Sequence, residues 1–316
     1  LSRRLINIIG SPQITRIMKN MSIYSWILLL LIVALLLISM YNSMHKKVEG
    51  FAQREPFVSK KNDNIYDSFY TNIYDDLFYK GFSTNYEVGT IVNQTSPTQE
   101  SKILEIGCKT GNVVGLLESK GYKNSTGIDI SESMIEIAKE KYPNGKFQVG
   151  DPQKAMLFDR GSFTHILMLN LSFYHFKNQR GLLQNCYEWL MPGGYMILSL
   201  VNKERFNPLP PATNPLLLVS PQRFAKKRIT KGKAVFNNFN YESNFSVFPN
   251  DMVMFQEIFK DTTTGNVRQN ELGLYMPNQN AILSMAKEVG YNVLGKIDLV
   301  KGQKEYQYLY ILYKPN

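Results

Sequence analysis

The chain has 316 residues, a formal net charge of +10 and two cysteines. This length suits one large domain or two modest ones, and 44% hydrophobic against 20% charged residues excludes a disordered protein. Two cysteines exclude a disulfide-built secreted scaffold, and their spacing matches no zinc site, so we expect no metal. Residues 1–62 hold nine Lys or Arg against two Glu, whereas residues 63–316 hold 27 basic against 24 acidic residues. The positive charge is therefore concentrated in the first fifth of the chain, which disfavours nucleic acid as a partner.

Residues 23–41 form an uncharged and almost wholly aliphatic run. No Asp, Glu, Lys or Arg occurs from Asn20 to Met44, and aromatic residues stand near both ends of the run. At about 1.5 Å per residue the run would reach about 28 Å, close to the hydrocarbon thickness of a bilayer. A buried core helix or a cleaved signal peptide is the alternative, but no polar face interrupts the run and no small-residue cleavage site follows it. The sequence predicts a single-pass transmembrane helix in contact with a lipid bilayer.

The side of the membrane on which the rest of the chain lies is a separate prediction. Basic residues flank the run on both sides, so counting charges does not decide the orientation. No disulfide is expected, and two of the four N-x-S/T sequons stand beside expected core strands, where a glycan would not fit. These sequons begin at Asn93, Asn124, Asn170 and Asn244. We expect the C-terminal domain on the cytosolic, reducing side of its membrane. Because the chain begins at Leu1, we also expect that it was processed or that its numbering starts inside the gene product.

A linker and then alternating elements follow the apolar run. Residues 42–62 are polar, basic and aperiodic, which is typical of a linker, and apolar spacing over residues 66–77 predicts a helix with Asp63 as its N-cap. Beyond residue 101, short apolar strands alternate with amphipathic helices, which predicts a doubly wound parallel sheet. The expected strands are 102–106, 124–130, 146–149, 165–169 and 195–200, and the expected helices are 112–120, 131–142 and 178–190.

The pattern changes after Val201. Residues 202–233 are rich in proline and basic residues, which suggests a surface excursion, and antiparallel strands are expected at 234–241, 252–261 and 267–276. A helix at 278–290 and strands at 291–300 and 306–314 return to the main sheet. The predicted organisation is a basic segment (1–22), a transmembrane helix (23–41), a basic linker (42–62) and one domain (63–316), in which residues 202–276 form the excursion and a β insertion.

Residues suited to binding a nucleoside stand at the ends of the first three strands of this domain. The segment ILEIGCKTGN follows the first strand and opens a helix, and glycines at such a turn let the backbone approach a ligand. Glu105 precedes the turn, Asp129 ends the second strand, where a carboxylate can accept both ribose hydroxyls, and Asp151 follows the third. A nicotinamide dehydrogenase would require G-x-G-x-x-G, which this loop lacks.

This constellation resembles the class I S-adenosylmethionine-dependent methyltransferases over roughly residues 63–316. The matching motifs are LEIGCKTG, GIDIS with SESMIEIAKEKYP, VGDPQ and LMPGGYMILSL. The resemblance implies an α/β fold, a doubly wound seven-stranded Rossmann-like methyltransferase sheet with a small antiparallel β insertion, and S-adenosylmethionine (SAM) as the cofactor. It further implies that the methionine part of SAM lies on Gly107, Cys108 and Gly111, beside Glu105. The ribose would bind Asp129, and the adenine would lie against Ile130, Met134, Asp151 and Pro152. The methyl group would lie over Asn170 and Leu171, and Tyr66 and Tyr70 would close the pocket.

Lys109 departs from the family pattern, because it stands where most members carry the middle glycine of G-x-G-x-G. Under one interpretation the backbone still fits and the side chain points outward. Under the other, its amine occupies space meant for the cationic sulfonium end of the cofactor, and two neighbouring positive charges are costly to bury. The direction of the Lys109 side chain therefore decides whether the cofactor site works or is weakened.

The acceptor side carries fewer signals. Residues 170–173 are not the Asn/Asp-Pro-Pro-Tyr/Phe tetrapeptide of enzymes that methylate exocyclic or amide nitrogens, which argues against a DNA base or glutamine as substrate. His175 can accept a proton from an acceptor, but it can equally be a hydrogen-bonded loop residue, and methyl transfer can proceed by alignment alone. The catalytic candidates are thus His175, Asn170 and Tyr70, while Cys186 lies among leucines and is expected in the core.

At a finer level the chain resembles methyltransferase-like proteins encoded by giant double-stranded DNA viruses. The segments concerned are YEWLMPGGYMILSLVNKERFNP, RITKGKAVFNNFNY and the run from ELGLYM to YLYILYK. Two functions remain open. The first is a membrane-anchored SAM-dependent methyltransferase acting on a small-molecule, lipid or protein acceptor. The second is a weakly active or inactive methyltransferase-fold protein that serves, with other virion or membrane-assembly proteins, as a structural component.

Overall fold

A computed structural model of the chain describes residues 22–44, 55–214 and 220–316, without the side chains of residues 38–44 and 223. The chain divides into two compact units, Leu1–Val48 and Glu49–Asn316. Of the predicted segments, nearly all of the basic stretch 1–22 and residues 45–54 of the linker lie outside the described residues.

The described part of the first unit is one helix, α3 (Ile23–Met44). The predicted helix therefore forms, and it extends three residues beyond residue 41. Its described side chains are uncharged and, except for Ser25, largely apolar, and most are exposed, with Ile23 at 72% and Leu30 at 65%. Among the residues with described positions, however, no helix combines the length and the apolar character that crossing a membrane requires. The prediction of a transmembrane span at residues 23–41 is thus not supported.

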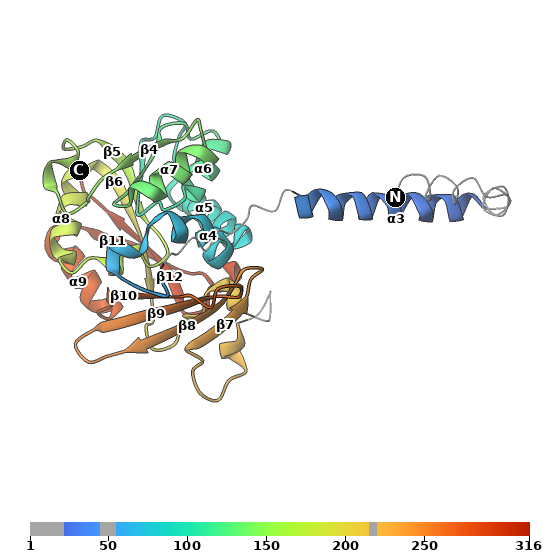
Figure 1. The fold of residues 1–316 in the computed structure, drawn as a ribbon. Coiled ribbons are helices and arrows are strands. Elements are labelled where there is room, and N and C mark those ends of the chain that lie inside the picture. Colours follow the sequence, from blue (N-terminus) through green and yellow to red (C-terminus); the bar gives the residue numbers. More distant parts are fainter. Residues whose placement is uncertain (1–21, 45–54, 215–219) are drawn as a thin grey trace, which may run out of the picture. The chain divides into compact units, whose positions relative to one another are not determined.

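The second unit is built on a seven-stranded sheet in the order β11-β12-β6-β5-β2-β3-β4 (Figure 1). Strands β2 to β6 pair in parallel, whereas β12 runs antiparallel to both β6 and β11. The strands are β2 (Ile103–Ile106), β3 (Ser125–Asp129), β4 (Lys146–Val149), β5 (Phe163–Met168), β6 (Leu190–Val201), β11 (Asn292–Asp298) and β12 (Gln307–Tyr313). This arrangement confirms the predicted Rossmann-like methyltransferase sheet. Strand order reverses between β2 and β5, and ligands of such sheets bind at the carboxyl ends of the strands beside that point.

Helices cover the sheet because each central strand is apolar on both faces. Leu104, Ile166 and Met196 belong to one buried cluster, whereas their neighbours Leu167 and Ile197 belong to another, as the two-residue period of a strand requires. The helices are α4 (Ser68–Phe78), α5 (Gly81–Thr95), α6 (Asn112–Ser119), α7 (Glu132–Lys141), α8 (Gln179–Trp189) and α9 (Gln279–Val289). Helix α5 has no counterpart among the predicted elements.

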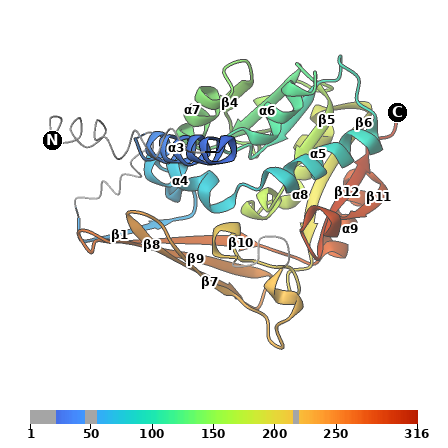
Figure 2. The same cartoon turned by 90° about the vertical axis from the view of Figure 1, so that its right-hand side faces the viewer.

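A second sheet has five strands in the order β1-β10-β9-β8-β7 and forms its own layer (Figure 2). Its strands are β1 (Phe57–Lys61), β7 (Lys231–Val235), β8 (Phe239–Val247), β9 (Met252–Asp261) and β10 (Val267–Tyr275). Strand β1 pairs in parallel with β10, so residues 57–61 are part of the fold and not of a linker. The single strand expected at 234–241 is also wrong, because a turn at Phe236, whose amide donates to the Phe239 carbonyl, separates β7 from β8.

Candidate active site

The turn after β2 has a left-handed backbone at every second residue. The φ angles are +72° at Gly107, +51° at Lys109 and +79° at Gly111. A Cβ atom on Gly107 would lie 2.7 Å from Oγ of Ser172, so glycine is required there for space as well as for conformation. Lys109 adopts a conformation that costs an L-residue energy, which explains why a glycine suits this position better. The loop thus keeps the glycine-loop geometry although one of the three residues is a lysine.

Asp129, at the end of β3, holds this turn in place. Its carboxylate accepts the backbone N–H of Lys109 at 3.0 Å and that of Ser131 at 3.0 Å. Asp129 is 8% exposed, and burial raises the pKa of its carboxyl despite these two hydrogen bonds. The carboxylate therefore joins the turn after β2 to the start of α7, where the Ser131 hydroxyl accepts the amide of Met134 and caps the helix, as predicted.

Glu105 is a buried carboxyl group with an unsatisfied oxygen. It is 4% exposed, and its Oε2 has no hydrogen-bond partner in the part of the chain that the structure describes. Burial raises the pKa of Glu105 to about 8, although the nearby Lys109 lowers it. Buried acceptors are rarely left unpaired, and this one borders the cavity described below. Glu105 is therefore ready to accept a hydrogen bond from a cationic ligand group.

The Lys109 side chain points into the site, so the interpretation with an outward side chain is wrong. Its Nζ donates to Oγ of Ser172 at 3.3 Å and lies 5.9 Å from the centre of the Tyr74 ring. Burial lowers the pKa of Lys109, because the charged form loses water there.

These groups border a cavity of about 300 Å³ at the carboxyl ends of β2 and β5. Nine of the predicted site residues line it: Tyr66, Tyr70, Glu105, Gly107, Cys108, Lys109, Asn170, Leu171 and His175. The other six do not: Gly111, Asp129, Ile130, Met134, Asp151 and Pro152. Among these, Met134 and Pro152 are buried, and Ile130 is 44% exposed. The cavity thus contains the positions expected for the acceptor and, except for Gly111, those expected for the methionine end, whereas the positions expected for the adenosine lie outside it.

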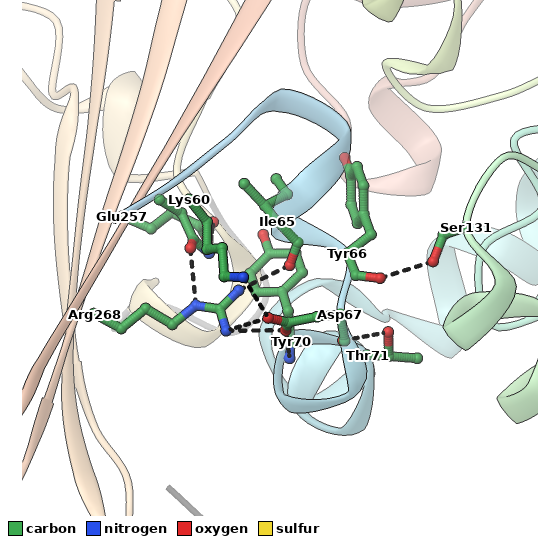
Figure 3. Close-up of polar contacts among 10 residues, drawn as sticks. Lys60, Ile65, Tyr66, Asp67, Tyr70, Thr71, Ser131, Glu257 and Arg268 are labelled. Carbon is green, nitrogen blue, oxygen red and sulfur yellow. Dashed lines mark hydrogen bonds and ion pairs between the residues drawn. The ribbon is translucent and has the colours of Figure 1, made fainter. Parts of the chain in front are cut away.

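The segment before α4 lies between the end of β3 and the second sheet (Figure 3). The carbonyl oxygen of Tyr66 accepts the Ser131 hydroxyl at 2.8 Å, which joins this segment to the end of β3. On its other side, Arg268 of β10 donates to both carboxylate oxygens of Asp67 at 2.8 and 2.9 Å and to the Ile65 carbonyl at 2.9 Å. The segment therefore links the two sheets across the site.

Helix α4 lines the cavity with Tyr70, Tyr74, Asp75 and Phe78, and we call it the α4 cover. Its N-cap is Asp67, whose side chain accepts the Tyr70 amide, and not Asp63 as predicted, because Asp63 lies in a short 3₁₀ helix (Asn62–Ile65) that precedes it. Farther along the helix, Asp75 accepts the hydroxyl of Thr110 at 2.6 Å and the side-chain amide of Asn112 at 2.9 Å. It also pairs with Lys141. These contacts hold α4 against the loop after β2, with Tyr66 and Tyr70 at the cavity.

The acceptor end of the cavity lies beyond β5. Asn170 has a left-handed φ of +56°, and its Oδ1 accepts Nζ of Lys304 at 2.8 Å. The His175 ring lies 6.2 Å from that of Tyr66. Burial, followed by the charge of Lys109, lowers the pKa of His175 to about 3, so this imidazole is neutral at physiological pH. The structure therefore brings all three catalytic candidates, His175, Asn170 and Tyr70, to one cavity.

Several residues at the site were not anticipated from the sequence: Lys80, Glu87, Ser172 and Lys304. Lys80 and Lys304 line the cavity, whereas Glu87, on α5, pairs with Lys304 at 2.6 Å. Lys304 lies 134 positions after Asn170, in the connection between β11 and β12, and no motif marks it. One signal could have found Ser172, because it directly follows the predicted pair Asn170 and Leu171 and a small side chain there leaves room for the glycine turn.

The fold and the site together define a Rossmann-like methyltransferase domain whose ligand site is at the switch point of the sheet. Comparisons with known proteins agree. Residues 103–194 match the family described as a methyltransferase domain. A demethylmenaquinone methyltransferase from Thermotoga maritima is 36% identical over 109 residues, which cover 33% of this chain and 47% of that protein. The chain thus spans about half the length of the curated relatives that it matches.

Solved structures share the fold over most of the second unit. A SAM-dependent methyltransferase from Clostridium acetobutylicum superposes with a TM-score of 0.59 at 16% identity, covering 78% of this chain and 98% of that one. A SAM-bound amino pentose methyltransferase from Micromonospora echinaspora gives 0.53 at 16% identity, covering 80% and 99%. At this identity the likeness establishes the fold. These findings do not show the finer resemblance to viral proteins.

Residues 103–194 are thus similar to a methyltransferase domain, and the solved structures that share the fold include a SAM-dependent and a SAM-bound methyltransferase, so SAM is the cofactor against which the site is compared. The residues at the site fit that cofactor. The unpaired Oε2 of Glu105 suits the ammonium group of the methionine part, and the turn lines the cavity from Gly107 to Thr110. Lys109, within the turn itself, carries a charge that opposes a cationic cofactor.

Proposed function

We propose that the whole chain is a SAM-dependent methyltransferase acting on a small-molecule, lipid or protein acceptor. The observation that carries the proposal is the cavity in which Glu105 and the turn at Gly107 face Asn170 and His175. The name of the Thermotoga relative, demethylmenaquinone methyltransferase, supports a small molecule among these acceptors. The retention of carboxylates at Glu105 and Asp129, each buried at the end of a strand, supports a site that still binds a nucleoside cofactor.

Bound SAM would supply an electrophilic methyl group, and the chain would align the acceptor and receive its proton. The α4 cover, with Tyr66, Tyr70 and Tyr74 at the cavity, excludes water from one side of the site. His175 is neutral and able to accept a proton, but a pKa of about 3 makes it a weak base. Alignment therefore contributes more to the rate than proton removal does.

Calorimetric titration of the purified full-length chain with SAM tests the proposal. We expect micromolar binding, and we expect Asp129→Ala to weaken it at least ~10-fold, about 1.4 kcal/mol, because the carboxylate organises both the turn and the start of α7. Asp159→Ala, at an exposed aspartate, is the matched control and should bind as the parent does. An absence of binding at millimolar SAM would contradict the proposal.

A second candidate function is structural, and Lys109 is the observation that favours it. An ammonium inside the cofactor site, at a position where relatives usually have glycine, is what a protein that no longer uses SAM would carry. In that case the fold would serve as a component of a membrane-linked assembly, such as a virion, with other assembly proteins as partners. Restoration of SAM binding by Lys109→Gly in a parent that does not bind would support this second function.

We also propose that the chain associates with a lipid bilayer through residues 23–41, with the second unit on the reducing side. The exposed apolar side chains of α3 support the association, because apolar surface on this scale is usually covered. The two free, buried cysteines, Cys108 and Cys186, are in keeping with a reducing compartment. Flotation with liposomes tests the proposal: the full chain should float, and recovery of the chain only in the dense, lipid-free fraction would overturn it.

A further inference from the structure

Three lysines from separate parts of the second unit line the same cavity. Lys80 precedes α5, Lys109 belongs to the turn after β2, and Lys304 lies between β11 and β12. Burial lowers the pKa of Lys80, and the charge of Lys304 lowers it further. Asp75, Glu105 and Glu305 line the cavity as well, so its charge is mixed. Lys80 and Lys304 lie close enough to repel one another, and this repulsion favours an anion between them.

Lys304 is the best positioned of the three. Its Nζ donates to Oε1 of Glu87 at 2.6 Å and to Oδ1 of Asn170 at 2.8 Å. Glu87 is 1% exposed on α5, so its carboxylate is a rigid support. An ammonium group has three N–H donors, and the described contacts of Lys304 engage two of them. The remaining donor is held at the end of β5, where the acceptor is expected.

The connection that carries Lys304 is itself tightly held. The Ser83 hydroxyl donates to the Gly302 carbonyl at 2.7 Å, and Nζ of Lys80 donates to the side chain of Gln303 at 3.0 Å. Gln303 and Tyr306 have left-handed φ angles of +62° and +59°. Such backbone conformations outside glycine cost energy and gather where a loop serves a function. The loop is thus built to present a lysine at a defined place.

The lining of the cavity also includes a group of apolar side chains. The second sheet and the segment before it supply Phe206, Phe245, Phe255, Leu272 and Leu274. From this combination we propose that Lys304 and Lys80 form an anion subsite that binds the carboxylate or phosphate of a methyl acceptor with an apolar body. The subsite deepens the proposed function and rests on it. SAM also has a carboxylate, so the experiment must distinguish the two sources of negative charge.

Removing Lys304 alone would leave Glu87 buried without its partner, which typically costs several kcal/mol of stability. The double variant Glu87→Gln/Lys304→Met removes both charges and keeps the side chains close to their original size. Lys301→Met is the matched control, because Lys301 is an exposed lysine of the same connection. Thermal unfolding of each variant verifies that it folds.

The probes are 4-phenylbutyrate, 3-phenylpropyl phosphate and the neutral 4-phenylbutyramide, titrated into the full-length chain saturated with S-adenosylhomocysteine (SAH). We expect one of the two anions to bind at least ~10-fold more tightly than the amide, about 1.4 kcal/mol. The anion that binds more tightly identifies the acidic group. The double variant should lose the preference for the anion, and Lys301→Met should keep it.

Three results would overturn the subsite. In the first, the anions and the amide bind the parent equally. In the second, the double variant keeps the preference. In the third, the double variant weakens the binding of SAM but not that of decarboxylated SAM, which would assign the lysines to the cofactor. In each case SAM binding by the parent leaves the proposed function intact, whereas a parent that binds neither SAM nor SAH removes the proposed function and the subsite together.

Discussion

Lys109→Gly changes two properties of the site at once, and a matched variant separates them. Glycine relieves the left-handed backbone at φ +51° and removes the ammonium beside Ser172. Lys109→Met removes the charge but keeps a long side chain on the same strained backbone. The difference between the two variants therefore measures the effect of backbone strain, and the change that both share measures the effect of removing the charge.

The backbone effect concerns stability. A left-handed conformation costs a residue other than glycine roughly 1–2 kcal/mol, and the larger entropy of glycine in the unfolded chain offsets part of the gain. We expect Lys109→Gly to be more stable than Lys109→Met by about 1 kcal/mol, which corresponds to ~2–4 °C in Tm for a domain of this size. Thermal unfolding of the two variants measures this difference.

The charge effect concerns the cofactor. The two charges concerned are the Lys109 ammonium and the sulfonium of SAM. Two unit charges about 6 Å apart at an effective dielectric constant of about 20 repel by about 3 kcal/mol, which is ~100-fold in Kd. SAH lacks the sulfonium charge, so both variants should increase the affinity for SAM relative to SAH by ~10- to 100-fold. Because burial lowers the pKa of Lys109, the difference between parent and variants should shrink as the pH rises and the lysine loses its proton.

Calorimetric titrations of SAM and SAH into the parent and both variants, at pH 6 and pH 9, measure this ratio. An unchanged ratio in both variants would refute the inference that the ammonium opposes the cofactor. A gain for Lys109→Gly alone would assign the effect to the backbone. Equal stability of the two variants would refute the strain argument.

Two further predictions concern other buried groups. Asp67→Asn keeps a residue that can cap α4 but leaves the buried guanidinium of Arg268, 4% exposed, without the carboxylate of Asp67. Unfolding in urea should therefore show an unfolding free energy lower by about 3 kcal/mol, and a loss below about 1 kcal/mol would contradict this. The raised pKa of Glu105 means that the native state binds more protons than the unfolded state between pH 4.5 and about 8, so the unfolding free energy should fall as the pH rises through this window. Glu105→Gln should flatten the profile, and a profile that stays as steep in this variant would exclude Glu105 as the source.

The seven-stranded sheet was predictable because its signals are local. Strand β2 (Ile103–Ile106) is wholly buried, and strands of this kind alternate with capped helices such as α7, which begins at Ser131 as expected. Strand β1 (Phe57–Lys61) was missed because FVSKK has little apolar character and its partner β10 lies about two hundred residues later. Helix α5 was missed because its buried side includes Ser83 and Glu87, which do not mark a core in a sequence.

The same distinction, between local signals and partners distant in the sequence, holds for the site. Glu105, Gly107 and Asn170 stand at strand ends, so the parallel sheet alone brings them to one edge, and they line the cavity as expected. The sequence reveals neither the left-handed backbone angle of Lys109 nor the contact of its side chain with Ser172. Lys304 reaches Asn170 only through the packing of a distant connection, so no spacing in the sequence could indicate it.

The pairing of β1 with β10 also sets the order in which the protein can be completed during synthesis. Phe57 pairs with Val267, and Asp67, at the start of the α4 cover, binds Arg268 of the same strand. At a synthesis rate of about 5–20 residues per second, the ribosome needs roughly 10–40 s between the two partners. Throughout that time Phe69 and Tyr70 of α4 lack Phe259 of β9, against which their rings pack in the complete fold. The nascent chain is therefore most prone to aggregate, and most in need of a chaperone, before its last third has emerged.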